Sequence, residues 1–309
     1  MHAQKSERAT LQTMGGEAAM LQDVMGSLGA LRSYVLLTYN GKSFDLPVLR
    51  GRTQRVGMDA FALHGPHVDL LHPARRLWNT GRGSCRLQRL ERDRWGIVRR
   101  DDIAGAEIPE VFWAQLASRG APDTSERMSR VLRHNALDLW SVAAVCEEVV
   151  HRLGRPTSLR EALAATHRSA QQSPARIIAL LQPWLQRAAL PTVGLCAERA
   201  LLASGFQVLV KAQRAVADHL GAVRTLEQWL AVAPGDPRAS TQLAMVLERD
   251  CRDLEGALRA AAQSREPSVR RIGRLQRRLQ AQRTARDASP KGGTGRPSTA
   301  GRGRLRSSS

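Results

Sequence analysis

The sequence predicts an α/β domain, an all-α domain behind it and a basic tail, in that order along 309 residues. Three observations predict this order. Through residues 1–153, short β-branched or aromatic runs alternate with helical segments, which is typical of an α/β layer. From 157 to 283 every periodic segment is helical. From 284 to 309 Gly, Ser, Pro, Thr and Arg dominate, which is typical of a disordered basic tail.

The first predicted elements lead to a strand that ends in a turn. Residues 16–31 place apolar side chains at helical spacing, and the run 35–39 predicts a strand closed by an Asn-Gly turn at Asn40. Asp45, two residues before a proline, predicts a helix start. Taken alone, Asn40 supplies a turn and Asp45 caps a helix. Both also bring polar groups to the end of a strand, where sites of α/β folds lie.

A second short strand and three helices complete the α/β half. The segment HVDLL at 67–71 predicts a strand that runs into a helix over 72–78, with Asp69 as a structural residue between them. VFWAQLA at 111–117 predicts a helix. Apolar residues recurring at three and four predict a long helix over 125–153.

The all-α half contains a weak internal repeat. Two proline-containing segments around Pro234 and Pro267 lie 33 residues apart, and GAV at 221 and GAL at 256 lie 35 apart. Helix pairs repeating near this period resemble tetratricopeptide repeats, which stack and present a groove for a protein partner. An irregular helical bundle is the alternative.

The charge of the chain favours a polyanionic partner. Lys and Arg number 47 against 28 Asp and Glu, a net charge of +19. Residues 251–309 hold 15 basic and four acidic residues, so much of the excess lies in this terminal segment. Only four of the basic residues are lysines, and such arginine usage also follows from coding bias.

Composition also limits compartment and metal chemistry. No run approaches the ~20 apolar residues of a membrane span, and the N-terminus lacks the layout of a signal peptide, so we expect a cytoplasmic protein. His64, His67 and His72 lie close together but lack a fourth ligand in sequence reach, which makes them weak metal candidates. The cysteines lie singly, without the CxxC spacing of a zinc site. They are Cys85, Cys146, Cys196 and Cys251.

One pair on the long helix carries chemistry. His134 and Asp138 are four residues apart and therefore share a helix face. Asp138 lies close to the apolar side of that helix, where a carboxylate must be paired, hydrated or bound to a cation. A salt bridge to an arginine is the structural alternative to a metal.

Five blocks in order resemble a known family across residues 17–150. They are TYNGKSFDLPVLRGR, HVDLLHPARRLW, SCRLQRLERDRWGI, DDIAGAEIPEVFW and LRHNALDLWSVAA. The resemblance is to the YprB-like ribonuclease H-fold domain, a branch of the DEDD 3′-to-5′ exonuclease superfamily. It implies a ribonuclease H-like α/β domain that hydrolyses DNA or RNA from a single-stranded 3′ end. Repeat-like helices also follow this domain in the family.

The resemblance assigns roles to particular residues. Its second motif falls on Asn40, Phe44 and Asp45 and its third on His134 and Asp138; Lys42 lies inside the second. It implies that Asp45 and Asp138 bind two Mg²⁺ or Mn²⁺ ions and that His134 orients or deprotonates the attacking water. Asn40, Lys42 and Phe44 would contact the substrate.

The first motif of that superfamily, Asp-x-Glu on the first strand, is not found before the 35–39 strand. The acids there are Glu7, Glu17 and Asp23, and their helical context makes them poor substitutes. We therefore expect an N-terminally incomplete domain with weak or no activity. One alternative is a non-catalytic pseudonuclease that binds a protein partner through its helical repeats. Another is an upstream start codon, with a longer and active protein.

Overall fold

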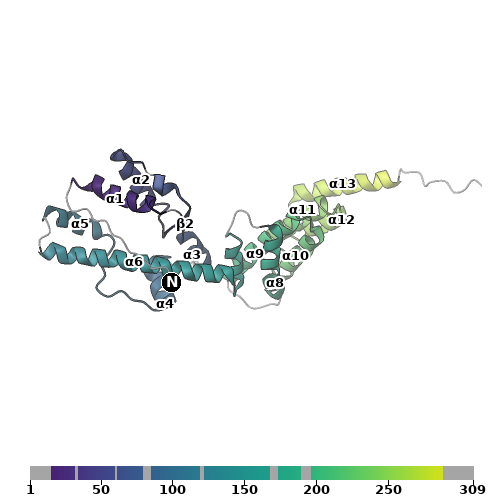
Figure 1. Cartoon of the computed structure of the whole chain (residues 1–309). Helices are drawn as coiled ribbons and strands as arrows, with labels where there is room; N and C mark the ends of the chain where they lie inside the picture. The colour runs from purple at the N-terminus through teal and green to yellow at the C-terminus, as the bar shows by residue number, and fades with distance from the viewer. Residues whose placement is uncertain are drawn as a thin grey trace, which may run out of the picture. The chain divides into compact units, whose positions relative to one another are not determined.

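Helices make up most of the protein, as the computed structural model shows (Figure 1). It describes residues 15–31, 34–59, 61–78, 85–118, 122–167, 173–188 and 196–287. Contacts divide the chain into two compact units. The first comprises Met1–Leu185 and Val193–Gly205, and the second comprises Gln186–Thr192 and Phe206–Ser309. The boundary that the sequence places at 153–157 stays a prediction.

The first unit contains a small parallel sheet and a set of helices. Its elements in chain order are α1 (Glu17–Gly29), β1 (Leu36–Thr38), α2 (Asp45–Arg55), the 3₁₀ helix η1 (Phe61–His64), β2 (His67–Asp69), α3 (Leu71–Trp78), α4 (Leu87–Trp95), α5 (Ile108–Ala117), α6 (Pro122–Gly154) and α7 (Leu159–Ala165). Helices α8 (Pro174–Ala188) and α9 (Cys196–Ala215) each have residues in both units. Within the described residues the sheet has two strands, β1 and β2.

The two predicted strands pair with each other in parallel. Leu36, Leu37 and Thr38 lie opposite His67, Val68 and Asp69. Parallel strands need a crossover, and α2 with η1 forms it. Side chains alternate between sheet faces. One face therefore carries Leu37 and Val68, which are 41% and 43% exposed. This face of the sheet is open to solvent in the part of the chain that the structure describes.

Helix α2 begins at Asp45, as the sequence predicts, but Asp45 does not cap it. Phe44 occupies the cap position, and no side chain makes a capping hydrogen bond there. Asp45 stands one residue inside the helix, where its negative charge faces the positive end of the helix dipole.

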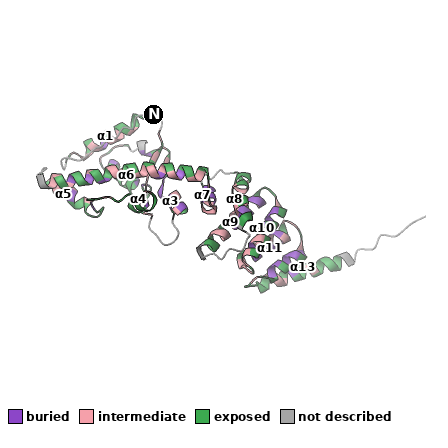
Figure 2. Ribbon diagram, turned by 90° about the horizontal axis from the view of Figure 1, so that it is seen from below, coloured by how far each residue is buried: buried purple, intermediate pink, exposed green. Residues whose placement is uncertain are grey.

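Helix α6 is the predicted long helix, and buried and exposed positions alternate along it (Figure 2). Met128 and Val131 pack with Ile103 and Val111 in one cluster. Val145 and Val149 pack in a second cluster that includes buried residues of α3 and α4. Leu139, which the periodicity places on the apolar side, is instead 59% exposed. The stretch between the two clusters is therefore free to carry polar groups.

The second unit is all helical over its described residues, as the sequence predicts. After α9 come α10 (His219–Val232), α11 (Pro237–Arg249), α12 (Leu254–Ala262) and α13 (Val269–Asp287). Neighbouring helices pack in sequence order, and Phe206 stacks on Trp229 with ring centroids 5.8 Å apart. Helix α13 continues to Asp287, past residue 284, where the sequence predicts a tail to begin. Residues 288–309 of that predicted tail lie outside the described residues.

The GAV and GAL segments belong to one local structure that occurs twice. Asp218 caps α10 by accepting from the Gly221 N–H at 2.9 Å, and Asp253 caps α12 by accepting from the Gly256 N–H at 2.8 Å. A Cβ on either glycine would come within about 2 Å of the capping carboxylate, so a larger residue would displace that carboxylate from the cap. The residue before each Asp has a φ of 58°. The capped turn thus recurs 35 residues later.

No described helix is both long enough and apolar enough to cross a membrane.

Candidate functional site

The turn after β1 is held by Asp69. Its buried carboxylate accepts from the backbone N–H of Asn40 at 2.8 Å, of Lys42 at 3.0 Å and of Leu71 at 3.0 Å. Burial raises the pKa of Asp69, but these three N–H groups outweigh it and hold the pKa below its usual value. Asp69 therefore has the structural role that its position predicts. It ties the end of β1 to the start of α3.

The geometry of the turn explains its Asn-Gly sequence. Asn40 has a φ of 70°, a left-handed conformation that Asn tolerates better than most residues. A Cβ on Gly41 would lie 2.5 Å from the Thr38 side chain, so a larger residue would displace it. The Asn40 side chain is left exposed at the carboxyl end of β1. A pocket of about 360 Å³ opens beside Asn40, lined also by Tyr39 and Arg75.

The other second-motif residues lie on the surface next to this turn. Lys42 and Asp45 are exposed, and the Phe44 ring is 66% exposed. Partial burial raises the pKa of the Asp45 carboxyl, and the nearby Asp69 charge adds to the shift. An exposed aromatic ring and an exposed cation next to each other suit a nucleic-acid strand, because rings stack on bases and cations attract phosphates.

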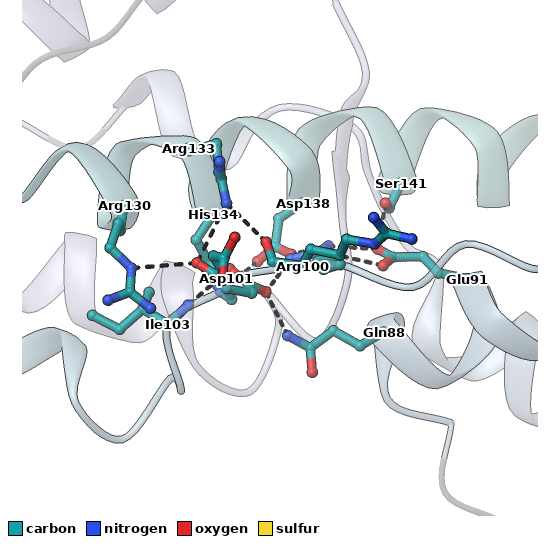
Figure 3. A network of polar contacts seen from close by, with 12 residues as sticks. Gln88, Glu91, Arg100, Asp101, Ile103, Arg130, Arg133, His134, Asp138 and Ser141 are labelled. Carbon is teal, nitrogen blue, oxygen red and sulfur yellow. Dashed lines mark hydrogen bonds and ion pairs between the residues drawn. The ribbon is translucent and has the colours of Figure 1, made fainter. Parts of the chain in front are cut away.

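The third-motif residues form a separate polar group on α6, between its two apolar clusters (Figure 3). His134 is 9% exposed, and its Nδ1 lies 2.8 Å from Asp102 Oδ1. Burial raises the pKa of Asp102, but His134 and Arg99 outweigh it and keep the pKa low. Because an ionised carboxylate only accepts, Nδ1 of His134 is the donor. His134 Nε2 then faces Asp138 Oδ2 at 3.5 Å.

Arg99 is the centre of this polar group. Its guanidinium donates to Asp138 Oδ1 at 2.7 Å, to Glu91 through two nitrogens at 2.5 and 2.8 Å, and to Asp102 at 3.3 Å. The Arg99 side chain is 5% exposed. Burial lowers the pKa of Arg99, yet the hydrogen bonds that it donates to Glu91 and Asp138 outweigh burial and raise the pKa. One buried cation therefore serves three carboxylates. In this structure Asp138 therefore pairs with an arginine, which is the structural alternative to binding a metal.

Further side chains complete the network. Ser141 on α6 donates to Glu91 at 2.5 Å, and Gln88 on α4 donates to Asp102 at 2.9 Å. Figure 3 shows His134, Asp138 and Ser141 on α6 facing Glu91 and Gln88. Glu91 is 1% exposed, and its bonds to Arg99 and Ser141 compensate its burial.

The structure brings some predicted site residues together and not others. His134 and Asp138 are neighbours, as their spacing predicts. Within the described residues, no hydrogen bond or ion pair joins Asp45 to either of them. The sequence motifs give no role to five members of the network, which are Gln88, Glu91, Arg99, Asp102 and Ser141. Four of these lie within the five sequence blocks, but only packing shows that they meet.

The donor set does not fit two divalent ions in this arrangement. Asp138 is already bonded to Arg99, whose positive charge lies among the carboxylates that cations would need. Across the described ranges, no group of three or more His, Cys, Asp or Glu side chains is placed to hold a metal ion. His67 contacts the Thr38 hydroxyl at 2.8 Å rather than joining His64 and His72. Glu17 of α1 pairs with Arg52, and Glu7 lies outside the described residues.

Comparisons with known proteins agree with the sequence blocks. Residues 4–150 match the family RNase_H_2, described as RNase_H superfamily. The chain is 32% identical over 133 residues to the uncharacterized protein YprB of Bacillus subtilis (strain 168). That stretch is 42% of this chain, and it spans only 30% of the length of YprB. No solved structure matches the chain. Residues 4–150 of this protein are therefore similar in sequence to the RNase H superfamily.

Proposed function

We propose that the N-terminal domain binds the 3′ end of single-stranded DNA or RNA, and that it is related to metal-dependent 3′-to-5′ exonucleases. The observation that carries this proposal is the pairing of His134 with Asp138 on α6 inside a region similar in sequence to the RNase H superfamily. In this proposal His134 Nε2 acts as the base and the 40% exposed Asp138 side chain as a metal ligand.

Arg99 is the reason to expect weak hydrolysis or none. Two Mg²⁺ or Mn²⁺ ions would activate water and stabilise the leaving oxygen, and Asp45 and Asp138 are the residues proposed to hold them. In the described arrangement Arg99 already neutralises Asp138, and Asp45 is not joined to it. A metal ion would have to compete with a buried guanidinium that makes several charged hydrogen bonds.

The test is nucleotide release from labelled single-stranded DNA and RNA with Mn²⁺. We expect the full chain to bind both probes and to release nucleotides slowly or not at all. Any release should disappear in Asp138→Asn, which removes a charge at nearly constant volume. Rapid Mn²⁺-dependent digestion that survives both Asp45→Asn and Asp138→Asn would overturn the site assignment.

Phe44 tests the binding half of the proposal. A base stacked on its exposed ring contributes about 1–3 kcal/mol, so Phe44→Ala should weaken binding of a single strand about tenfold. The matched control is Trp113→Ala, because Trp113 on α5 is also exposed, at 54%, but lies outside the motif. Equal affinities for Phe44→Ala and the unmodified protein would remove Phe44 from the binding surface.

The second candidate is a pseudonuclease that acts as a scaffold through its helices. Two observations favour it: the Arg99 network, and the capped turn that recurs at Asp218 and Asp253 as in a helical repeat. Metal dependence separates the candidates. Mn²⁺ should tighten nucleic-acid binding by an exonuclease-like site and leave it unchanged in a pseudonuclease. We expect Asp138→Asn to abolish the Mn²⁺ effect in the first case only.

A further inference from the structure

The helical unit carries a basic pocket that the proposed function does not use. It has a volume of about 630 Å³ and lies where the end of α11, the start of α12 and α13 meet. Its polar lining residues are Glu248, Arg249, Arg252, Arg278 and Gln282. Three arginines and one glutamate therefore face this space, which we call the arginine pocket.

The single acid of the arginine pocket does not neutralise its free arginines. The Glu248 side chain is 2% exposed and is already bound by Arg274 at 2.7 Å and, more closely, by Arg278. Arg249 and Arg252 are exposed, and within the described residues their side chains make no hydrogen bond or ion pair. An incoming anion thus meets two guanidinium groups without partners.

The backbone conformation at Arg252 indicates that the turn does not require an arginine side chain. Arg252 has a φ of 58°, and a non-glycine residue in this conformation costs about 1 kcal/mol. The equivalent residue of the other capped turn is Ala217, with the same φ. A small side chain therefore suffices for the turn, and the long cation lines the pocket instead.

The segment that follows α13 does not offer an occupant. Residues 288–309 contain no Asp or Glu, but one Lys and four Arg. Their charge has the same sign as the arginine pocket, so they do not complement it. An anion from another molecule does complement the pocket.

The size and chemistry of the arginine pocket point to a phosphate chain. Its volume lies in the ~300–1,000 Å³ range of ligand sites, large enough for a nucleotide. Guanidinium groups bind phosphate oxygens in pairs. No aromatic residue lines it, so bases have no ring to stack on. A second hollow of about 540 Å³ on α13 includes Arg277 and shares the small residue Ala281, which leaves a path for a linear ligand.

From these observations we propose that the arginine pocket binds the phosphodiester backbone of a single-stranded nucleic acid without reading its sequence. This inference rests on the proposed function, because it assumes a chain that binds nucleic acid. It adds a second binding site in the helical unit, at Arg249, Arg252 and Arg278.

The test uses the full chain in EDTA, so that hydrolysis plays no part. Anisotropy of a fluorescein-labelled oligo(dT) of roughly 20 nucleotides reports affinity as a function of salt. The variant Arg249→Gln/Arg252→Gln removes both free cations and leaves Arg278 to Glu248. The matched control Arg224→Gln/Arg238→Gln removes two exposed arginines of the same unit that do not line the pocket.

We expect the pocket variant to bind about tenfold more weakly and its slope of log affinity against log salt to fall by about 1.4, the value for two lost phosphate contacts. The control should change by less than about twofold. Equal weakening by the two double variants would mean diffuse charge and overturn the proposal. An unmodified protein that does not bind the probe would overturn it together with the proposed function.

Arg252→Gly separates binding from folding. Glycine relieves the left-handed backbone, so the melting temperature should stay or rise while affinity falls. Lower stability would show that the side chain serves the fold, against the proposal. Phe44→Ala in the same assay probes the N-terminal domain. If only the pocket variants weaken binding, the proposed function fails and the arginine pocket stands; if only Phe44→Ala does, the reverse holds.

Discussion

Arg99 carries more charged hydrogen bonds than any other side chain of the polar network. Arg99→Gln would leave Glu91 buried with Ser141 as its remaining side-chain partner. Breaking a buried ion pair on one side costs about 3–5 kcal/mol, and we expect a loss of that order in the free energy of unfolding, measured by urea denaturation. The control Arg89→Gln breaks the exposed pair with Asp93 and should cost less than about 1 kcal/mol.

The double variant Arg99→Gln/Glu91→Gln sharpens this prediction. It removes both the cation and the charge that the cation serves, so it should recover part of the lost stability. If Arg99→Gln is no less stable than Arg89→Gln, the network is not the buried cluster described above.

Asp69 gives a prediction with a defined pH dependence. Asp69→Asn replaces a carboxylate that accepts three backbone N–H bonds, and should lower the free energy of unfolding by about 1–3 kcal/mol at neutral pH. The folded pKa of Asp69 lies below the unfolded value of about 3.9. The stabilisation is therefore complete above that value and is lost as pH falls through the folded pKa.

Denaturation at several pH values checks this sign. The difference between Asp69→Asn and the unmodified protein should shrink only in acid, below about pH 4. A difference that stays constant down to that range, or that grows, would contradict the assignment of Asp69 as an ionised structural acceptor.

At the scale of elements, the two-stranded sheet has an apolar face that is exposed to solvent. Leu37 and Val68 are neighbours in register and present an open apolar face, which invites association with other chains. Leu37→Thr/Val68→Thr keeps residues that favour strands while making the face polar. We expect this variant to self-associate less, as measured by light scattering across protein concentrations, with little change in melting temperature.

A control for the sheet variant is Leu139→Gln/Val150→Gln, which makes two exposed positions of α6 polar. Its self-association should match that of the unmodified protein. If the α6 variant reduced self-association more than the sheet variant, the surface that mediates association would lie on α6 instead.

At the scale of the whole molecule, the two units predict independent folding of the second. Apart from Gln186–Thr192, that unit begins within α9, at Phe206, whereas α7 packs on α3 and α6 of the first unit. A fragment of residues 196–287 should therefore show a cooperative helical melt by circular dichroism. A longer fragment from residue 157, the boundary predicted from sequence, should gain little stability. A large gain would favour the earlier boundary, and a non-cooperative melt of 196–287 would contradict the division.

Much of the local structure could be predicted from the sequence. The strands at 35–39 and 67–71, the helix start at Asp45 and the long helix over 125–153 follow from periodicity and turn chemistry, which act over a few residues. The turn at Asn40 could also be predicted. Its hydrogen bond with Asp69 could not, because the two residues lie 29 residues apart. Leu139 was misplaced, since its periodicity does not reveal that polar groups interrupt the buried face.

By itself the sequence determined the order of elements, the all-helical second half and the His134–Asp138 pair, because spacing along one helix decides which side chains share a face. Only the tertiary structure decided what surrounds that pair. Glu91 and Ser141 meet across 50 residues, and Arg99 reaches Asp138 across 39. Burial makes such partners obligatory, because an unpaired charge in the interior is costly. The chain has many arginines that could pair with these carboxylates. Packing decides which one does, and here it is Arg99.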